Sequence, residues 1–156
     1  MIASIESLEF AGRLTNDHVE QLWRILQSEA WGRGRTLKDV RRAIEHSDLI
    51  FPLCDRESGR LVAFARVLTD FVYKATVLDV VVEQHHRDLR FGKVLLDAIT
   101  AHPALLFVEH IEVACHEKMA PFYEKCGFQA RVHTTRVMCK VQEPLFGKTS
   151  VVPKAS

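Results

Sequence analysis

The segment from Tyr73 to Ile99 constrains the fold more than any other part of the chain. Tyr73–Val82 ends in three consecutive valines, and a β-branched run of this kind suits a strand covered on both faces. The polar and basic stretch Glu83–Arg90 follows. A helix is then predicted from apolar residues that recur at helical spacing: Phe91, Val94, Leu95, Ala98 and Ile99. A covered strand that leads into a helix predicts an α/β fold.

The rest of the chain predicts a mixed sheet with flanking helices. Further strands are expected at Ile5–Phe10, Leu49–Cys54, Leu61–Leu68, Leu106–Cys115 and Thr134–Val141. Further helices are expected at Asn16–Ser28, after Thr36 and at Met119–Cys126, with Thr15 and Thr36 as N-caps. The order is one strand, two helices, three strands, one helix, one strand, one helix and one or two strands. It predicts six to seven strands and about four helices.

The length of 156 residues fits one domain. We interpret residues 1–141 as that domain. Residues 142–156, which contain two prolines and a glycine, are expected to form a C-terminal tail.

Charge and composition narrow the class of protein. The 21 basic and 20 acidic residues nearly balance, which argues against general binding to nucleic acid or to a membrane surface. There is neither an apolar run of membrane-spanning length nor a secretory signal, so a cytoplasmic protein is expected. The four cysteines form no Cys-x-x-Cys pair, which predicts reduced thiols and no metal site.

The junction between the valine strand and the following helix is a candidate anion site. The first backbone N–H groups of a helix lack internal partners, and the helix dipole adds positive potential there. Gly92 would let an anion approach the backbone, and Arg87, Arg90 and Lys93 add positive charge. The sequence therefore indicates a diphosphate cradle. The alternative is an ordinary strand-to-helix turn with solvated basic side chains.

Two motifs resemble those of the GNAT acetyltransferase superfamily. In motif A, a strand precedes Arg or Gln, two variable residues, Gly, any residue, and Gly or Ala; here Arg87 takes the first place and Gly92 the last. Arg90 stands where the first glycine is usual, and Gln84 where a proline is common. Ala120–Phe128 resembles motif B, with its Tyr-x-Lys-x-Gly-Phe core. The resemblance covers roughly residues 5–141.

The resemblance implies a mostly antiparallel sheet in which two central parallel strands splay apart and hold acetyl-CoA. The pantetheine arm would pair with the backbone of Val80, Val81 and Val82. Arg87 and the following loop would hold the pyrophosphate: Asp88, Leu89, Arg90, Phe91, Gly92 and Lys93. An amine would attack the thioester directly, and backbone N–H groups near Val81 could polarise its carbonyl.

The resemblance also implies catalytic roles. Tyr123 would protonate the departing thiolate, although a packing role in its helix is the alternative. Asp79 and Glu112 are carboxylates among apolar neighbours, where burial would raise their pKa toward the range of a general base. Glu83 is a third and poorer choice. A structural role stays open for each carboxylate, since a water chain could remove the proton.

Glu29 and Trp31 are expected at the acceptor side, because the loop between the first two helices faces it in the family; a plain packing role for Trp31 is the alternative. The acceptor would be a small-molecule or protein amine, and a homodimer is plausible. The alternative to an enzyme is a regulatory module that binds coenzyme A but turns over weakly or not at all, with Arg90 as the residue that impairs its loop.

Overall fold

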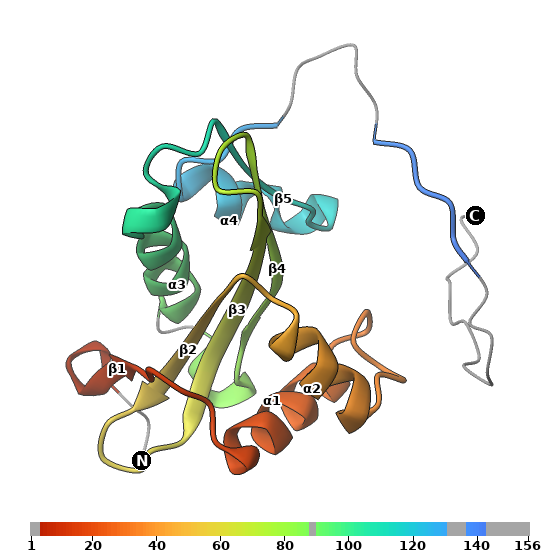
Figure 1. Ribbon diagram of the computed structural model, residues 1–156. Coiled ribbons are helices and arrows are strands. Elements are labelled where there is room, and N and C mark those ends of the chain that lie inside the picture. The colour runs from red at the N-terminus through yellow and green to blue at the C-terminus, as the bar shows by residue number, and fades with distance from the viewer. Residues whose placement is uncertain (1–3, 88–89, 131–136, 143–156) are drawn as a thin grey trace.

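The computed structural model describes residues 4–87, 90–130 and 137–142 (Figure 1). The helices of these residues are α1 (Asn16–Ser28), α2 (Leu37–Glu45), α3 (Phe91–Thr100) and α4 (Ala120–Lys125). The strands are β1 (Leu8–Phe10), β2 (Leu49–Asp55), β3 (Leu61–Thr69), β4 (Lys74–Val82) and β5 (His110–Val113). Short 3-10 turns lie at Ile5–Ser7, Gln84–His86, Pro103–Leu105 and Glu117–Met119.

The strands form one mixed sheet in the order β1-β2-β3-β4-β5. Neighbours are antiparallel except β4 and β5, which are parallel. A parallel pair needs a crossover, and α3 supplies it. The mixed, mostly antiparallel α/β architecture and the four helices predicted from the sequence are therefore confirmed for the described residues.

The predicted number of six to seven strands is wrong for the described residues, which form five. The last strand was expected at Thr134–Val141. Residues 137–142 form no strand, and Val137 and Met138 are almost fully exposed, so no sheet neighbour covers them. Residues 134–136 lie outside the described part of the chain.

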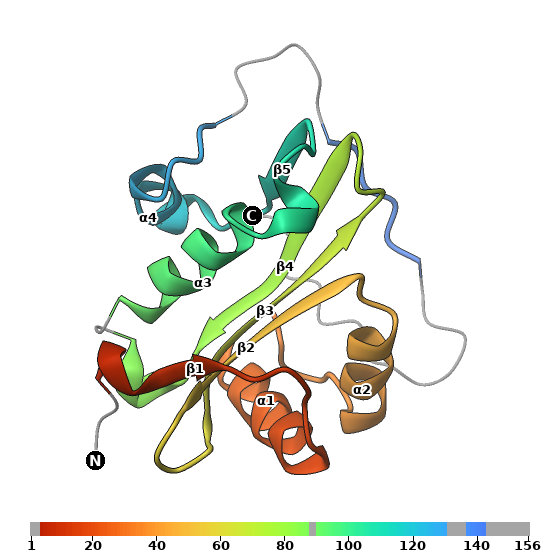
Figure 2. The same cartoon turned by 60° about the vertical axis from the view of Figure 1, so that its left-hand side comes forward.

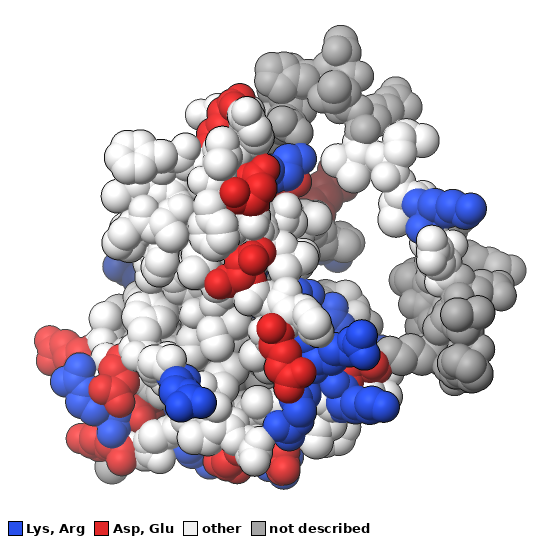
Figure 3. All heavy atoms as spheres, viewed as in Figure 1, with Lys and Arg blue, Asp and Glu red and all other residues white. Residues whose placement is uncertain are grey.

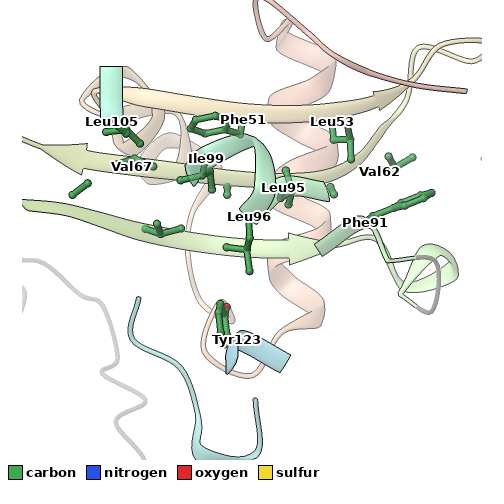
Figure 4. Close-up of a cluster of buried hydrophobic side chains, with 14 residues drawn as sticks. Phe51, Leu53, Val62, Val67, Phe91, Leu95, Leu96, Ile99, Leu105 and Tyr123 are labelled. Atoms are coloured by element: carbon green, nitrogen blue, oxygen red, sulfur yellow. The ribbon is translucent and has the colours of Figure 1, made fainter. Parts of the chain in front are cut away.

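Helices cover both faces of the sheet (Figure 2). α1 and α2 pack on one face around Leu22, Leu26 and Phe64. α3 and α4 pack on the other, where the larger cluster gathers the side chains shown in Figure 4. Phe91, Leu95 and Ile99 of α3 are fully buried there, as the helical spacing of the sequence predicts.

The predicted N-caps hold the start of both N-terminal helices. The Thr15 hydroxyl accepts from the backbone N–H of His18, and the Thr36 hydroxyl accepts from that of Asp39. Each bond satisfies a donor that a helix leaves without an internal partner. The caps fix where α1 and α2 begin, and Thr36 thereby marks the end of the loop that joins them.

Two negative findings apply to the described residues alone. None of their helices is long and apolar enough to cross a membrane. No group of three or more His, Cys, Asp or Glu side chains among them could hold a metal ion.

Candidate functional site

Strand β4 continues beyond its parallel neighbour. The pairing with β5 runs from Lys74↔His110 to Val77↔Val113 and ends there, while β4 goes on to Val82. Within the described chain, Leu78–Val82 therefore has a strand partner only on the β3 side. This edge lies past the end of β5, and it presents backbone groups to which an extended ligand can add. The resemblance implies a gap between the two parallel strands at this place.

A bulge lies in β4 at the start of this edge. The register with β3 shifts between Phe64↔Val81 and Arg66↔Leu78, so β4 holds one residue more than its partner. Asp79, inside the bulge, has a φ of 54°, a left-handed conformation that Asp tolerates better than most residues. The bulge turns the Asp79 side chain toward the α1–α2 face of the sheet, where the cavity described below lies.

Two guanidinium groups bind the Asp79 carboxylate. Arg35 Nη1 donates to Oδ1 at 2.9 Å and Arg66 Nε donates to Oδ2 at 2.6 Å. The Asp79 side chain is only 8% exposed, so these are charge-assisted bonds shielded from solvent. Each carboxylate oxygen of Asp79 already accepts a hydrogen bond from an arginine, which favours a structural role for Asp79 over proton abstraction.

Glu112 lies on the same face of the sheet as Asp79. Its neighbours Ile111 and Val113 pack into the α3–α4 core, so the alternation of a strand points Glu112 the other way. Its Oε1 is 3.3 Å from Lys74 Nζ and 3.4 Å from the Thr76 hydroxyl. The side chain is more exposed than that of Asp79, and it precedes the unpaired edge rather than lining it.

Glu83 directly follows β4 and is held by two histidines. The Nδ1 atoms of His85 and His86 lie 2.8 and 2.7 Å from its carboxylate oxygens. Burial raises the pKa of the Glu83 carboxyl, but hydrogen bonds from His85 and His86 outweigh it and the pKa is lowered. Glu83 therefore stays ionised at neutral pH.

The start of α3 has the features of an anion site. Its N-cap, Arg90, has a φ of 62° and makes no side-chain capping bond, so the N-cap side chain satisfies none of the first amide groups of α3. Arg90 thus adopts the left-handed conformation for which the family uses glycine. Phe91 is buried and stacks on His86, which anchors the turn.

Gly92 serves packing of α3 against α4. A Cβ at Gly92 would lie 2.9 Å from Cζ of Phe122, so only a glycine lets the two helices approach this closely. The sequence attributed the glycine to an approaching anion, whereas its near neighbour in the structure is an aromatic ring. Lys93, one residue on, forms an ion pair with Asp97 at 2.5 Å on the exposed side of α3.

Arg87, which was predicted to bind the pyrophosphate, forms an ion pair with Glu29, which was predicted to lie at the acceptor side. The Arg87 guanidinium donates to the Glu29 carboxylate, and its Nε makes a long 3.5 Å contact with the Val82 carbonyl. The structure thus brings the predicted cofactor side and acceptor side into direct contact. Asp88 and Leu89 lie outside the described residues.

Tyr123 lies in the core between α4 and the sheet (Figure 4). It is 8% exposed, and its ring meets those of Phe122 and Phe128 edge to face. Burial, followed by the nearby Cys115 and Cys126 thiols, raises its pKa to about 12. The packing role is therefore present in the structure, and the hydroxyl stays protonated at every physiological pH.

The loop between α1 and α2 is fixed by Arg35. Its guanidinium lies 5.2 Å from the Trp31 ring centroid, and its carbonyl accepts from Trp23 Nε1 and Gln27 Nε2. Trp31 itself is half exposed. Figure 3 shows Lys and Arg side chains gathered beside α1 and α2.

A cavity of about 190 Å³ lies beneath this loop, between α1, α2 and strands β3 and β4. Apolar and charged side chains line it: Leu22, Leu26, Arg35, Asp39, Val40, Ala43, Ile44, Phe64, Arg66 and Asp79. Sequence reasoning missed Arg35 and Arg66. An arginine in the midst of the apolar strand Leu61–Leu68 was the available signal, because a buried cation requires a carboxylate partner.

Comparison with known proteins identifies the family. A family model described as an acetyltransferase (GNAT) domain matches residues 48–130, more than half of the chain. The uncharacterized N-acetyltransferase ycf52 of Porphyra purpurea is 31% identical over 115 residues, which span 72% of this chain and 66% of the relative. Serotonin N-acetyltransferase 2, chloroplastic, of Oryza sativa is 34% identical over 91 residues, 57% of this chain and 46% of the relative.

Solved structures of acetyltransferases have a similar fold. A GNAT-family protein of Xanthomonas campestris is 29% identical and has a TM-score of 0.76, covering 86% of this chain and 93% of that one. Glucosamine-6-phosphate N-acetyltransferase of Arabidopsis thaliana, at 19% identity, shares the fold with a TM-score of 0.66 over 87% of this chain and 99% of that one. With a family match over more than half of its length, the chain belongs to the GNAT acetyltransferase family.

Proposed function

We propose that this protein is an acetyl-CoA-dependent N-acetyltransferase that transfers the acetyl group to a primary amine by direct attack. The observation that carries the proposal is the edge Leu78–Val82, which continues β4 past the end of β5 and leads to the start of α3, where the N-cap side chain of Arg90 makes no capping bond. The edge of β4 offers strand pairing to an extended ligand. The start of α3, at the far end of the turn that follows β4, offers amide donors for phosphate.

The residues present fit the two halves of coenzyme A. The backbone of Val80, Val81 and Val82 is the proposed partner of the pantetheine amides. The start of α3 would bind the diphosphate through the backbone of Arg90, Phe91, Gly92 and Lys93, preceded by Asp88 and Leu89. Arg87, 45% exposed in its side chain, adds a cation beside this turn. The left-handed Arg90 supports the fit, because it gives the turn the shape that glycine gives in the family.

Acetyl-CoA supplies a thioester carbon that a neutral amine attacks, with the coenzyme A thiolate as the leaving group. Backbone N–H groups of the β4 bulge near Val81 would polarise the thioester carbonyl. Tyr123 would donate its hydroxyl proton to the thiolate. Its raised pKa keeps that proton in place but makes the phenol a weaker acid, so Tyr123 acts chiefly as a hydrogen-bond donor.

The contacts of the three candidate carboxylates decide which one we propose as the general base. Both Asp79 oxygens bind arginine, so we propose that Asp79 shapes the bulge and aligns the β4 amides. The Glu112 side chain is more exposed to solvent than that of Asp79 and forms an ion pair with Lys74. Glu112 acting through water is therefore the base we propose, with Glu83 as the second candidate.

The acceptor would enter beside the α1–α2 loop, with Trp31 as a wall and Glu29 as the carboxylate that draws an ammonium group. The cavity beneath the loop would take the apolar part of the amine. The rice relative is named for serotonin, an indole with a primary amine at the end of an ethyl side chain, and the aromatic wall is compatible with such an acceptor.

The test is to follow thiol release from acetyl-CoA with a panel of primary amines, beside calorimetry with coenzyme A. Tyr123→Phe is expected to lower kcat while coenzyme A binding persists, and Tyr73→Phe, in the other and exposed tyrosine, serves as control. Binding of coenzyme A without turnover on any amine would support the regulatory module instead. No binding at all would refute both.

A further inference from the structure

The contact between Glu29 and Arg87 joins the two substrate sides proposed above. Glu29 ends α1, and Arg87 lies three residues before the N-cap of α3. The Arg87 side chain is 45% exposed and that of Glu29 is 25% exposed. The pair is therefore partly solvated and can open without unpacking the core, whose clusters contain neither residue.

The position of Glu29 is unfavourable for a carboxylate. The C-terminal end of a helix carries partial negative charge, and the last turn of α1 has no basic residue. The Glu29 carbonyl accepts from the amides of Gly32 and Arg33, but these bonds leave the side chain untouched. Among the described residues, Arg87 supplies the cation that compensates the Glu29 carboxylate.

When coenzyme A is bound, its diphosphate offers Arg87 a stronger partner than Glu29. The one other contact of Arg87 in the described chain is the long one to the Val82 carbonyl. A partly exposed ion pair contributes little to stability, whereas guanidinium binds phosphate through short, charge-assisted and often bidentate bonds. A diphosphate at the start of α3 would therefore replace Glu29 as the partner of the Arg87 guanidinium.

We propose that Glu29 is an internal competitor of the diphosphate for Arg87, so that coenzyme A binding breaks this ion pair and frees the Glu29 carboxylate at the acceptor side. The inference rests on the proposed function and adds a coupling between its two sites. Coupling of this kind is reciprocal: a cation that binds Glu29 frees Arg87 and tightens coenzyme A binding by the same factor. Glu29 is thus a positioning residue that acts through Arg87.

Calorimetry of coenzyme A binding tests the exchange. Glu29→Gln is expected to tighten the Kd about two- to fivefold, the range of a surface ion pair. If the ion pair between Glu29 and Arg87 had only a structural role, Glu29→Gln would weaken coenzyme A binding or leave it unchanged. Glu20→Gln is the matched control, since it removes the same charge from the same helix at an exposed pair with Arg24 and is expected to leave the Kd unchanged.

A double-mutant cycle assigns the effect to Arg87. Arg87→Gln is expected to weaken coenzyme A binding, and Glu29→Gln is expected to have no further effect in that background. The inference is overturned if Glu29→Gln does not tighten binding in the wild-type background, or if it tightens binding equally with Arg87→Gln present. In either case the proposed function stands as long as wild-type protein binds coenzyme A and transfers acetyl.

Carboxylate labelling keeps the test independent of the variants' folding. Wild-type protein is treated with a carbodiimide and an amine with and without coenzyme A, and peptides are analysed by mass spectrometry. Labelling of Glu29 is expected to rise on addition of coenzyme A, with Glu20 as the internal reference. Labelling that stays constant or falls would contradict release of the Glu29 side chain.

Discussion

Gly92 of α3 lies against the ring of Phe122 of α4, so that a Cβ on Gly92 would stand 2.9 Å from the ring carbon Cζ. The ring is half-buried and packs edge to face on Tyr123, with centroids 5.1 Å apart. The glycine thus connects the start of the proposed diphosphate helix to the helix that carries the proposed acid.

Gly92→Ala is expected to destabilise the protein by about 1 kcal/mol, because the ring must shift to admit the methyl group. Chemical denaturation measures the change. Gly12→Ala, at a glycine with no neighbour within 4 Å, is the control. Phe122→Leu should relieve the clash, so additive effects of Gly92→Ala and Phe122→Leu would refute the explanation.

Arg90→Gly is expected to stabilise the fold by about 1 kcal/mol, because a non-glycine residue at a φ of 62° bears steric strain that glycine lacks. Coenzyme A binding should survive, since the backbone of the turn is kept. Thermal unfolding and calorimetry check the two statements. A lower melting temperature for Arg90→Gly would mean that the Arg90 side chain stabilises the turn.

Asp79→Asn is expected to cost about 3 kcal/mol, because it leaves Arg35 and Arg66 without their shared carboxylate in a site shielded from water. Asparagine tolerates the left-handed backbone, so the change isolates the loss of charge. Glu112→Gln, at a half-exposed pair with Lys74, should cost about 0.5 kcal/mol or less. Equal costs in denaturant titrations would contradict the role of Asp79 as the anchor of the bulge.

Alkaline titration reports the burial of Tyr123. Burial raises the pKa of Tyr123 to about 12, above the unfolded value near 10, so the folded state holds its proton longer. The stability that this provides is complete below pH 10 and is lost as pH rises toward 12. Tyr73→Phe leaves Tyr123 as the one tyrosine, and its absorbance change near 295 nm should appear only close to pH 12. A midpoint near 10 would mean that the ring is solvated.

Cys54 is expected to be the least reactive thiol. Burial, followed by the charge of Glu9, raises its pKa to about 11, so almost no thiolate is present at pH 8. Cys115 and Cys139 are exposed. A colorimetric thiol reagent should therefore modify them quickly and reach Cys54 only after denaturant is added. Rapid modification of all four thiols in the folded protein would contradict the burial of Cys54.

The sequence predicts most of the fold because its elements carry local signals. The stripe Val19, Leu22 and Leu26 predicts α1, and the caps Thr15 and Thr36 mark the helix starts that the structure confirms. The strand expected at Thr134–Val141 is the main error of fold. Alternation of side chains can indicate a strand, but a strand also requires a hydrogen-bonded neighbour, which residues 137–142 lack.

The sequence was less informative about the site, because contacts between distant residues leave no local pattern. Arg35 and Asp79 are 44 positions apart, and Glu29 and Arg87 are 58 apart. Arg87 and Lys93 were both expected to face phosphate, yet in the structure each is paired with a carboxylate. The catalytic roles of Tyr123 and Glu112 and the anchoring role of Asp79 remain predictions.

Arg35 is held at both its ends, by side-chain contacts with Asp79 and Trp31 and by a carbonyl that serves Trp23 and Gln27. Replacing it would disturb the loop, the bulge and the cavity at once. Trp31, by contrast, is half exposed and lies over the Arg35 guanidinium. Under the proposed function, substitutions at Trp31 would therefore change the acceptor side while the contacts of Arg35 with Asp79, Trp23 and Gln27 stay in place.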